Sequence, residues 1–247
     1  MVAYNNIINR IGSKTNDIKS FVQYLPLDVE IIVEPFAGSF SVSKCFYKDV
    51  EKYEFHINDL DETLFFIYNN FEEMINIYKK LLKIFNERYI NNYKEFHKYF
   101  KELEMNEHIK TYINNSYFVR GSLFKTLKKF NPNPYEIDIL MDSKKTNLNY
   151  KDIFNEYQFN EKAFLFLDPP YLFSDNSGYK PQINKNDMTL IIVDILDLLK
   201  NSKCKIMLII NKLDILVYLF KDYIKGEYER IYQLSKKKTV HLIITNY

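Results

Sequence analysis

The stretch Ala163-Phe164-Leu165-Phe166-Leu167-Asp168-Pro169-Pro170-Tyr171 decides the fold class of this chain. Its first part is a continuous apolar run, which is typical of a strand buried on both faces of a sheet. An acid and two prolines then end the strand, because proline lacks the amide donor that a sheet needs. Ligands of open α/β sheets bind beyond the carboxyl ends of the strands. The stretch therefore predicts a buried strand that presents a carboxylate, backbone carbonyls and an aromatic ring to a ligand.

Other segments repeat this pattern on both sides of the stretch. Glu30–Glu34 is a short apolar run that stops at the loop Pro35–Ser39, and we expect a helix to begin near Ser39. Glu54–Asp59 is a second strand that ends in an acid and precedes a helix. The later expected elements are a helix over Met188–Lys200, a buried strand over Cys204–Ile210, and two final strands over Glu227–Gln233 and Thr239–Thr245. Together they predict an α/β fold with a mainly parallel, doubly wound sheet and an antiparallel terminal strand pair.

The middle of the chain has a different character. From Glu72 to Tyr117 the pattern is helical, charged and rich in aromatic residues, and no strand signal interrupts it. The segment Asn131–Pro134 is typical of a loop, and the polar stretch Asp142–Asn149 is expected to be exposed. We therefore expect an inserted helical lobe over residues 72–149, which interrupts a catalytic domain formed by residues 1–71 and 150–247.

The bulk composition excludes several classes of protein. The chain has 247 residues, 47% of them apolar, so it can bury a real core, and its net charge of +2 excludes a general polycation. The first ten residues lack the apolar core of a signal peptide, and charged residues break both of the most apolar segments. The four histidines share no spacing and the two cysteines have no metal-ligand spacing, so the sequence predicts no metal site. We expect a soluble cytoplasmic protein, compatible with a bacterial, phage or viral setting.

The segment from Asp168 to Tyr171 is suited to methylation of an exocyclic amino group of a nucleic-acid base. Such an amine is a poor nucleophile, because its lone pair is delocalised into the ring. A carboxylate and a backbone carbonyl that accept its two hydrogens would draw the nitrogen toward tetrahedral geometry and stabilise the charge that develops on it. Tyr171 offers a stacking face to a base extruded from the helix, which partly offsets the cost of flipping. The alternative interpretation is an ordinary Asp-Pro turn after a strand.

Two of the other strand ends carry residues that fit a nucleoside ligand. Gly38 allows the backbone to approach a ligand closely, and Phe36 can form the wall of an apolar pocket. Asp59 can accept hydrogen bonds from both hydroxyls of a ribose, as acids after the second strand do in dinucleotide folds. Taken alone, each of these features is equally typical of an ordinary turn with a helix cap.

The chain resembles the Dam-type, adenine-specific DNA methyltransferases, which carry an Asp-Pro-Pro-Tyr motif. The resemblance rests on Ile11-Gly12-Ser13-Lys14 with Ile18 and Leu25-Pro26, on Val33–Ser39, on Asn58-Asp59, on Asp168–Tyr171 and on the ending Val240–Tyr247, in the order of the family. It implies the S-adenosylmethionine-dependent methyltransferase fold, with the helical insert as a target-recognition domain. It also implies DNA as the partner, S-adenosyl-L-methionine as the methyl donor and S-adenosyl-L-homocysteine as the product.

The resemblance assigns roles to particular residues. The catalytic residues would be Asp168, Pro169, Pro170 and Tyr171. The cofactor would be bound by Gly12, Lys14, Glu34, Pro35, Phe36, Gly38, Asp59 and Asp168. In the insert, which matches the family only loosely, the nucleic acid would be bound by Arg120, Lys125, Lys128, Lys129 and Asn131, where the lysines are equally typical of a solvated charged face.

The sequence departs from the family at two turns. The cofactor loop has Phe40 where the family has a second glycine, and the N-terminal turn has Gly12-Ser13 in place of paired glycines. These departures keep a second hypothesis open, namely a catalytically silent nucleic-acid-binding protein or the scaffold subunit of a methyltransferase pair. An RNA adenine methyltransferase is a further alternative, and cytosine is less favoured because related enzymes more often use Ser where Asp168 stands. The sequence leaves open a homodimer, a restriction endonuclease partner and the target site.

Overall fold

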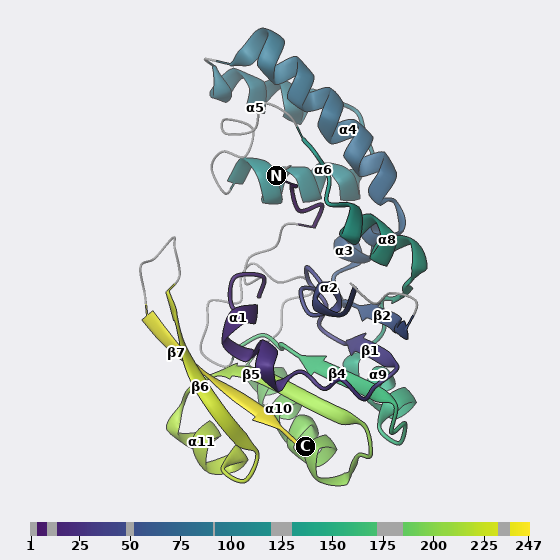
Figure 1. Cartoon of the computed structure of the whole chain (residues 1–247). Coiled ribbons are helices and arrows are strands. Elements are labelled where there is room, and N and C mark those ends of the chain that lie inside the picture. The colour runs from purple at the N-terminus through teal and green to yellow at the C-terminus, as the bar shows by residue number, and fades with distance from the viewer. Residues whose placement is uncertain are drawn as a thin grey trace. The chain divides into compact units, whose positions relative to one another are not determined.

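The computed structural model of the chain describes residues 4–8, 14–47, 52–90, 92–119, 130–171, 185–231 and 238–247. It divides into two compact units (Figure 1). One unit comprises Met1–Gly12 with Glu62–Asp142, and the other comprises Ser13–Asp61 with Ser143–Tyr247. The continuous part of the helical unit thus runs from residue 62 to residue 142. The unit also contains residues 1–12, which the sequence-based division places with residues 13–71.

A seven-stranded sheet forms the centre of the second unit, in the order β3-β2-β1-β4-β5-β7-β6. The strands from β3 to β5 run parallel, and β7 runs antiparallel to both β5 and β6. Their bounds are β1 Ile31–Glu34, β2 Glu54–Asn58, β3 Lys144–Thr146, β4 Ala163–Leu167, β5 Lys205–Asn211, β6 Ile224–Ile231 and β7 Lys238–Thr245. The expected mainly parallel α/β sheet with an antiparallel terminal pair is therefore confirmed.

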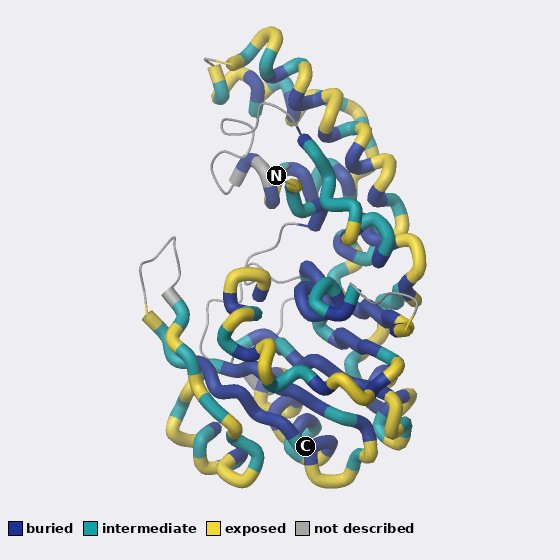
Figure 2. The backbone as a smooth tube through the Cα atoms, viewed as in Figure 1, coloured by how far each residue is buried: buried dark blue, intermediate teal, exposed yellow. Residues whose placement is uncertain are grey.

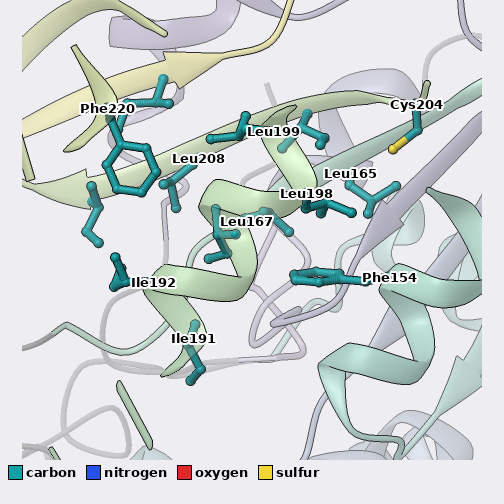
Figure 3. Packing of buried hydrophobic residues seen from close by; sticks show 14 of the residues in the cluster. Phe154, Leu165, Leu167, Ile191, Ile192, Leu198, Leu199, Cys204, Leu208 and Phe220 are labelled. Carbon is teal, nitrogen blue, oxygen red and sulfur yellow. The ribbon is translucent and has the colours of Figure 1, made fainter. Parts of the chain in front are cut away.

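Helices cover one face of this sheet through side chains of alternate strand residues. These helices are α9 (Tyr150–Tyr157), α10 (Lys185–Asn201) and α11 (Asp214–Phe220). Figure 3 shows Leu165, Leu167 and Leu208 of the sheet with Phe154, Ile192 and Phe220 of the helices in this core. All five residues of β4 are buried, which explains why its sequence is apolar without alternation (Figure 2).

The opposite face carries α1 (Ile18–Phe21), the short 3₁₀ helix η1 (Val22–Tyr24) and α2 (Ser43–Phe46). Its core contains Phe164 and Phe166 of β4 with Met207 and Ile209 of β5. Phe21 of α1 stacks on Phe166, with ring centroids 5.6 Å apart. Because side chains alternate along a strand, the next residues with this orientation after Phe166 and Ile209 are Asp168 and Asn211.

One local expectation was wrong, and three short elements were not expected. The helix expected near Ser39 begins at Ser43, because Gly38 and Phe40 have φ of 52° and 39° and residues 38–42 form turns. The stretch 142–149 contains β3, which pairs with β2 at the edge of the sheet and is followed by α9. The helix α11, which follows the strand expected over Cys204–Ile210, was not expected. Short edge strands and helices of seven or eight residues leave weak periodic signals in a sequence.

The other unit is helical, as the sequence predicts for its central part. Its helices are α3 Glu62–Asn69, α4 Phe71–Ile84, α5 Tyr93–Glu102, α6 Glu107–Ile113 and α8 Pro134–Asp142, with π-helical segments η3 Phe85–Tyr89 and η4 Asn114–Val119. Within this unit the fully buried Glu136 carboxylate accepts hydrogen bonds from the Ile7 and Ile8 amides, and the Tyr112 hydroxyl donates to the Ile7 carbonyl at 2.9 Å. Residues 4–8 are thereby fastened to the helices. Across the described ranges, no helix is both long and apolar enough to cross a membrane.

Candidate active site

The carboxyl ends of β2, β1 and β4 lie next to each other at one edge of the sheet. β1 pairs with β2 on one side and with β4 on the other, with Val33 opposite His56 and Leu165. The segments that follow these strands are Asn58-Asp59, Pro35–Gly38 and Asp168–Tyr171. The fold therefore brings together three segments that the sequence marks as ligand-binding.

Lys14, Asp168 and Tyr171 form a closed hydrogen-bonded triangle. The Lys14 ammonium donates to Asp168 Oδ2 at 2.5 Å and to the Tyr171 hydroxyl at 2.8 Å. The Tyr171 hydroxyl in turn donates to Asp168 Oδ1 at 3.1 Å. Pro169 and Pro170 are buried between them. The structure thus joins a lysine expected in the cofactor segment to the expected catalytic loop, although they are 154 positions apart in the chain.

The Lys14–Asp168 pair is largely shielded from water. The side chain of Lys14 is 3% exposed and that of Asp168 is 20% exposed. Burial lowers the pKa of Lys14 below its ordinary value, and the Asp168 carboxylate opposes part of this effect. A short contact between a buried ammonium and a partly exposed carboxylate fixes the orientation of the carboxylate while leaving it accessible from one side.

A second polar network connects this triangle to the β6–β7 hairpin. Arg230 pairs with Asp17 at 3.1 Å, and the Tyr228 hydroxyl donates to Asp17 at 3.4 Å. His241 Nδ1 lies 3.3 Å from the same Tyr228 hydroxyl, and the His241 ring meets the Tyr171 ring edge-on with centroids 5.3 Å apart. Because the single hydrogen of the Tyr228 hydroxyl is donated to Asp17, His241 Nδ1 must donate to this hydroxyl. The hydrogen of the neutral imidazole is therefore on Nδ1. No local sequence signal marks this network, because its members come from three distant segments of the chain.

The charges of this second network are buried as well. Burial raises the pKa of Asp17, and Arg230 opposes the effect. Burial, together with the nearby Lys14 and Arg230 charges, lowers the pKa of His241 to about 3. His241 is therefore neutral at ordinary pH and packs against Tyr171 as an uncharged ring.

The loop after β1 is held in a defined shape by Asp59. Gly38 N donates to Asp59 Oδ2 at 2.8 Å, and Asp61 N donates to Asp59 Oδ1 at 3.0 Å. Gly38 has a φ of 52°, which a residue without a Cβ adopts at no steric cost. These two bonds fix the orientation of the Asp59 carboxylate at the carboxyl end of β2.

Asn58 ties the same loop to the segment before α9. Its amide nitrogen donates to the Pro35 carbonyl at 2.9 Å and to the Leu148 carbonyl at 3.1 Å. Its amide oxygen accepts from Thr146 Oγ1 and from Leu148 N, both at 2.8 Å. The link brings Tyr150 against Phe36, with ring centroids 5.6 Å apart. These partly buried rings give the loop an apolar surface. The sequence predicts this role for Phe36 but not for Tyr150.

Two residues of the loop point into the protein. Glu34 is buried and accepts hydrogen bonds from Ser43 N at 2.7 Å and from Ser43 Oγ at 2.6 Å. Burial raises the pKa of Glu34 to about 7, although both hydrogen bonds oppose the rise. Phe40 is also fully buried, and Lys44 Nζ lies 4.9 Å from the centre of its ring. The loop therefore keeps the positive φ that suits glycine at position 40 while a phenylalanine occupies it.

The residues expected to bind nucleic acid are mostly outside the described residues. This holds for Arg120, Lys125, Lys128 and Lys129, and also for Gly12 of the cofactor segment. Asn131 is described, and its backbone pairs with Asn5 through Asn5 N to Asn131 O at 2.7 Å and Asn131 N to Asn5 Oδ1 at 2.9 Å. The nucleic-acid contacts of these residues remain predictions.

The sheet and the site define the class of the protein. A mostly parallel seven-stranded sheet with an antiparallel final pair, and with ligand-type residues after β1, β2 and β4, is the fold of S-adenosylmethionine-dependent methyltransferases. The family of D12 class N6 adenine-specific DNA methyltransferases matches residues 11–134, which is half of the chain. The chain belongs to this family, and it is an adenine-specific DNA methyltransferase.

A curated relative is similar along almost the whole chain. The Type II methyltransferase M.CviBI of Paramecium bursaria Chlorella virus NC1A is 25% identical over 288 aligned residues, covering 98% of this chain and 99% of the relative. The similarity therefore extends beyond residue 134 into the segment that contains Asp168. Membership of a methyltransferase family implies S-adenosylmethionine as the methyl donor.

Proposed function

We propose that the chain transfers a methyl group from S-adenosylmethionine to the N6 amino group of an adenine extruded from DNA, and that Asp168-Pro169-Pro170-Tyr171 is the catalytic loop. The observation that carries the proposal is the contact of the Asp168 carboxylate with Lys14 and Tyr171 at the carboxyl end of β4. This carboxylate stands beside the loops that follow β1 and β2, so a donor and an acceptor can meet there.

Asp168 has the hydrogen-bonding capacity that the reaction requires. Each of its oxygens accepts one hydrogen bond from Lys14 or Tyr171, and a carboxylate offers about four acceptor positions in all. Asp168 can therefore accept one hydrogen of the amine, and a backbone carbonyl of the Pro169-Pro170 segment can accept the other. The nitrogen then forms the new bond to the methyl carbon as the bond from that carbon to sulfur breaks, and the amine loses one proton toward Asp168 or water.

Lys14 and Tyr171 keep the carboxylate in place during this step. The buried ammonium compensates the negative charge of Asp168, so the carboxylate can be held in a site with little water. Tyr171 is partly buried, and its ring can stack on the extruded base with a gain of about 1–3 kcal/mol. That gain partly offsets the cost of a few kcal/mol for taking the base out of the helix.

The donor fits the loops after β1 and β2. A carboxylate such as Asp59 suits ribose hydroxyls, the Phe36 and Tyr150 rings suit an adenine ring, and Gly38 permits close approach of the backbone. Gly12, Lys14, Glu34 and Pro35 complete the proposed set, with Glu34 and Pro35 acting through the shape of the loop rather than through free side-chain donors or acceptors. When bound, the donor supplies an electrophilic methyl group on a sulfonium centre.

The test is methyl transfer by the wild type and by Asp168→Ala. A labelled methyl group is offered with duplex DNA, single-stranded DNA and RNA, and mass spectrometry of the digested nucleosides identifies the base. We expect N6-methyladenine from DNA with the wild type and none with Asp168→Ala. The exposed Asp197 on α10 provides the matched control Asp197→Ala, which should transfer normally. Normal transfer by Asp168→Ala would overturn the mechanism, and methylation of RNA alone would overturn the choice of DNA.

The second test addresses the alternative of a silent scaffold subunit. Phe40 motivated that alternative, but the φ of 39° at Phe40 keeps the loop conformation that a glycine would adopt. We expect S-adenosylmethionine to bind the wild type in calorimetry, and absence of binding at millimolar concentration with DNA present would favour the silent protein. The name of the viral relative supports a Type II methyltransferase. A homodimer, an endonuclease partner and a cytoplasmic location remain predictions.

A further inference from the structure

Asn211 carries a buried polar atom that has no partner. Its side-chain oxygen is buried, and it accepts no hydrogen bond in the part of the chain that the structure describes. Native proteins pair almost all buried polar atoms, because an unpaired one loses its hydration without compensation. An orphan of this kind at a functional site points to a partner that a ligand supplies.

The position of Asn211 in the sheet places it at the active site. It is the last residue of β5, the strand that lies between β4 and β7. Along β5 it follows Met207 and Ile209, whose side chains share a core with Phe164 and Phe166 of β4. Because side chains alternate, Asn211 projects from the same face of the sheet as Asp168.

Tyr171 lies across this same strand end. It follows β4, yet its ring contacts His241 of β7, with ring centroids 5.3 Å apart. His241 is the residue directly opposite Asn211 in the pairing of β5 with β7. The Tyr171 ring therefore reaches from β4 across β5 to β7 at the level of Asn211, so Asn211 stands beside the catalytic loop.

The order of the strands indicates which ligand Asn211 meets. The loops that suit the donor follow β1 and β2, on one side of β4, whereas β5 lies on the other side. Asn211 is therefore on the side of the methyl acceptor. An amide presents one acceptor and one donor side by side, which complements the edge of an adenine, where the amino group adjoins a ring nitrogen.

We propose that the Asn211 amide forms hydrogen bonds with the edge of the adenine that enters the site, and that it is a substrate-binding residue of this enzyme. The inference rests on the proposed function, since it takes the extruded adenine as the ligand. It goes beyond the four residues of the catalytic loop, because Asn211 belongs to another strand and its side-chain oxygen accepts no hydrogen bond from that loop.

The first experiment compares Asn211→Leu with Ser143→Ala in stability and in methyl transfer. Ser143 Oγ is the matched control, because it too is buried with no hydrogen-bond partner among the described residues, but it lies before β3, away from the catalytic loop. Leu has nearly the shape of Asn without its polar atoms, so the melting temperature should not fall in either variant. We expect kcat/KM to fall about tenfold or more for Asn211→Leu and to stay unchanged for Ser143→Ala.

The second experiment shows whether the lost contact is to the base. DNA affinity is measured with a duplex that contains the methylated adenine, once the product has identified that position, and with the same duplex lacking this base. We expect Asn211→Leu to bind the complete duplex more weakly than the wild type and to bind the abasic duplex equally well. Asn211→Ala serves as the second variant if Asn211→Leu fails to fold, with the same expectation.

Two results would overturn the inference. One is wild-type kcat/KM in Asn211→Leu or Asn211→Ala, and the other is an equal loss of affinity for the complete and the abasic duplex. Either result would leave the proposed function intact, provided that the wild type methylates adenine in DNA. Failure of the wild type to do so would instead contradict the proposed function itself.

Discussion

Lys14 is the residue on which the geometry of the catalytic loop depends most directly. Its ammonium contacts both the Asp168 carboxylate and the Tyr171 hydroxyl, and it is almost completely buried. Lys14→Met keeps the length of the side chain but removes both hydrogen bonds. A displacement of about 1 Å at a reacting group can cost on the order of a hundredfold in rate. We expect kcat for methyl transfer to fall about a hundredfold, measured at saturating donor and DNA.

The same substitution has a smaller effect on folding. Removing one member of a buried ion pair costs about 3–5 kcal/mol when the other charge stays buried. The partly exposed Asp168 can be hydrated instead, so we expect a loss of about 2 kcal/mol or less in the free energy of unfolding. Lys19→Met on α1 is the control, because Lys19 is exposed, and it should change neither quantity. A kcat of Lys14→Met within twofold of the wild type would contradict the role given to Lys14.

At the scale of elements, the loop between β1 and α2 stores backbone strain at Phe40. The residue has a φ of 39°, and a left-handed conformation costs an L-residue with a side chain about 1–2 kcal/mol. Its ring is fully buried, and removal of a buried Phe ring costs about 3–5 kcal/mol. Burial therefore outweighs strain, which explains how a phenylalanine can occupy a position whose backbone suits glycine.

Substitution of Phe40 should separate these two effects. Phe40→Gly loses the ring but relieves the strain, and we expect it to be about 3 kcal/mol less stable than the wild type. Phe40→Ala loses the ring and keeps the strain, so it should be about 1 kcal/mol less stable still in urea denaturation. Val42, which is buried at an ordinary φ of −80°, is the matched site. At position 42 the order of stability should reverse, so that Val42→Gly is less stable than Val42→Ala. If the Gly and Ala variants had the same order of stability at both positions, strain at Phe40 would be ruled out.

The elements differ in how far the sequence could predict them. The parallel strands β1, β2, β4 and β5 were predictable to within one residue at either end. For β1, β4 and β5 the signal is a continuous apolar run with an abrupt stop, and for β2 it is a short segment that ends in Asn58-Asp59 before a helix. The edge strand β3 and the helix α9 escaped detection, because their stability comes from partners rather than from their own pattern. Thr146 of β3, for example, bonds to Asn58, which is 88 positions away.

The residues of the candidate site likewise differ in whether a local sequence signal marks them. Lys14, Asp59 and Asp168 stand at strand ends or in family motifs, so a local signal marks them. The pairing of Asp17 with Tyr228 and Arg230 has no such signal, since Tyr228 lies 211 positions from Asp17. Asn211 could have been found by the rule that marked Asp168, because it too follows a buried apolar run.

At the scale of the whole molecule, four buried groups in the unit of residues 13–61 and 143–247 give opposite responses to pH. Burial lowers the pKa of His56 to about 4, with Lys144 adding to the effect, and lowers that of His241 to about 3. Burial raises the pKa of Glu34 to about 7, and it also raises the pKa of Asp17. The histidines therefore resist protonation on folding, whereas the two acids favour it.

The sign of each contribution follows from which state binds more protons. Below pH 6.5 the unfolded chain protonates its histidines while the folded protein does not, so each histidine costs about 3 kcal/mol of stability between pH 6.5 and 4. Glu34 acts in the other direction. Its contribution is fully present below pH 4.5 and is lost as the pH rises through about 7, with a total of about 3 kcal/mol. Asp17, whose pKa is also raised, acts in the same direction as Glu34, so acid weakens the contributions of the two histidines while it strengthens those of the two acids.

Substitution of one group at a time should separate these contributions in the free energy of unfolding, measured by urea titration with circular dichroism at pH 7, 5.5 and 4.5. Glu34→Gln keeps the oxygen that accepts from Ser43 N and Oγ but cannot bind the proton. Its stability relative to the wild type should therefore fall by about 3 kcal/mol between pH 7 and 4.5. His241→Gln should show the opposite change, so that its stability relative to the wild type rises as the pH falls. The reason is that the unfolded chain of the variant no longer takes up that proton. Parallel pH curves for the wild type and Glu34→Gln would mean that Glu34 is ionised in the folded protein, and then its two hydrogen bonds to Ser43, rather than its burial, would determine its charge.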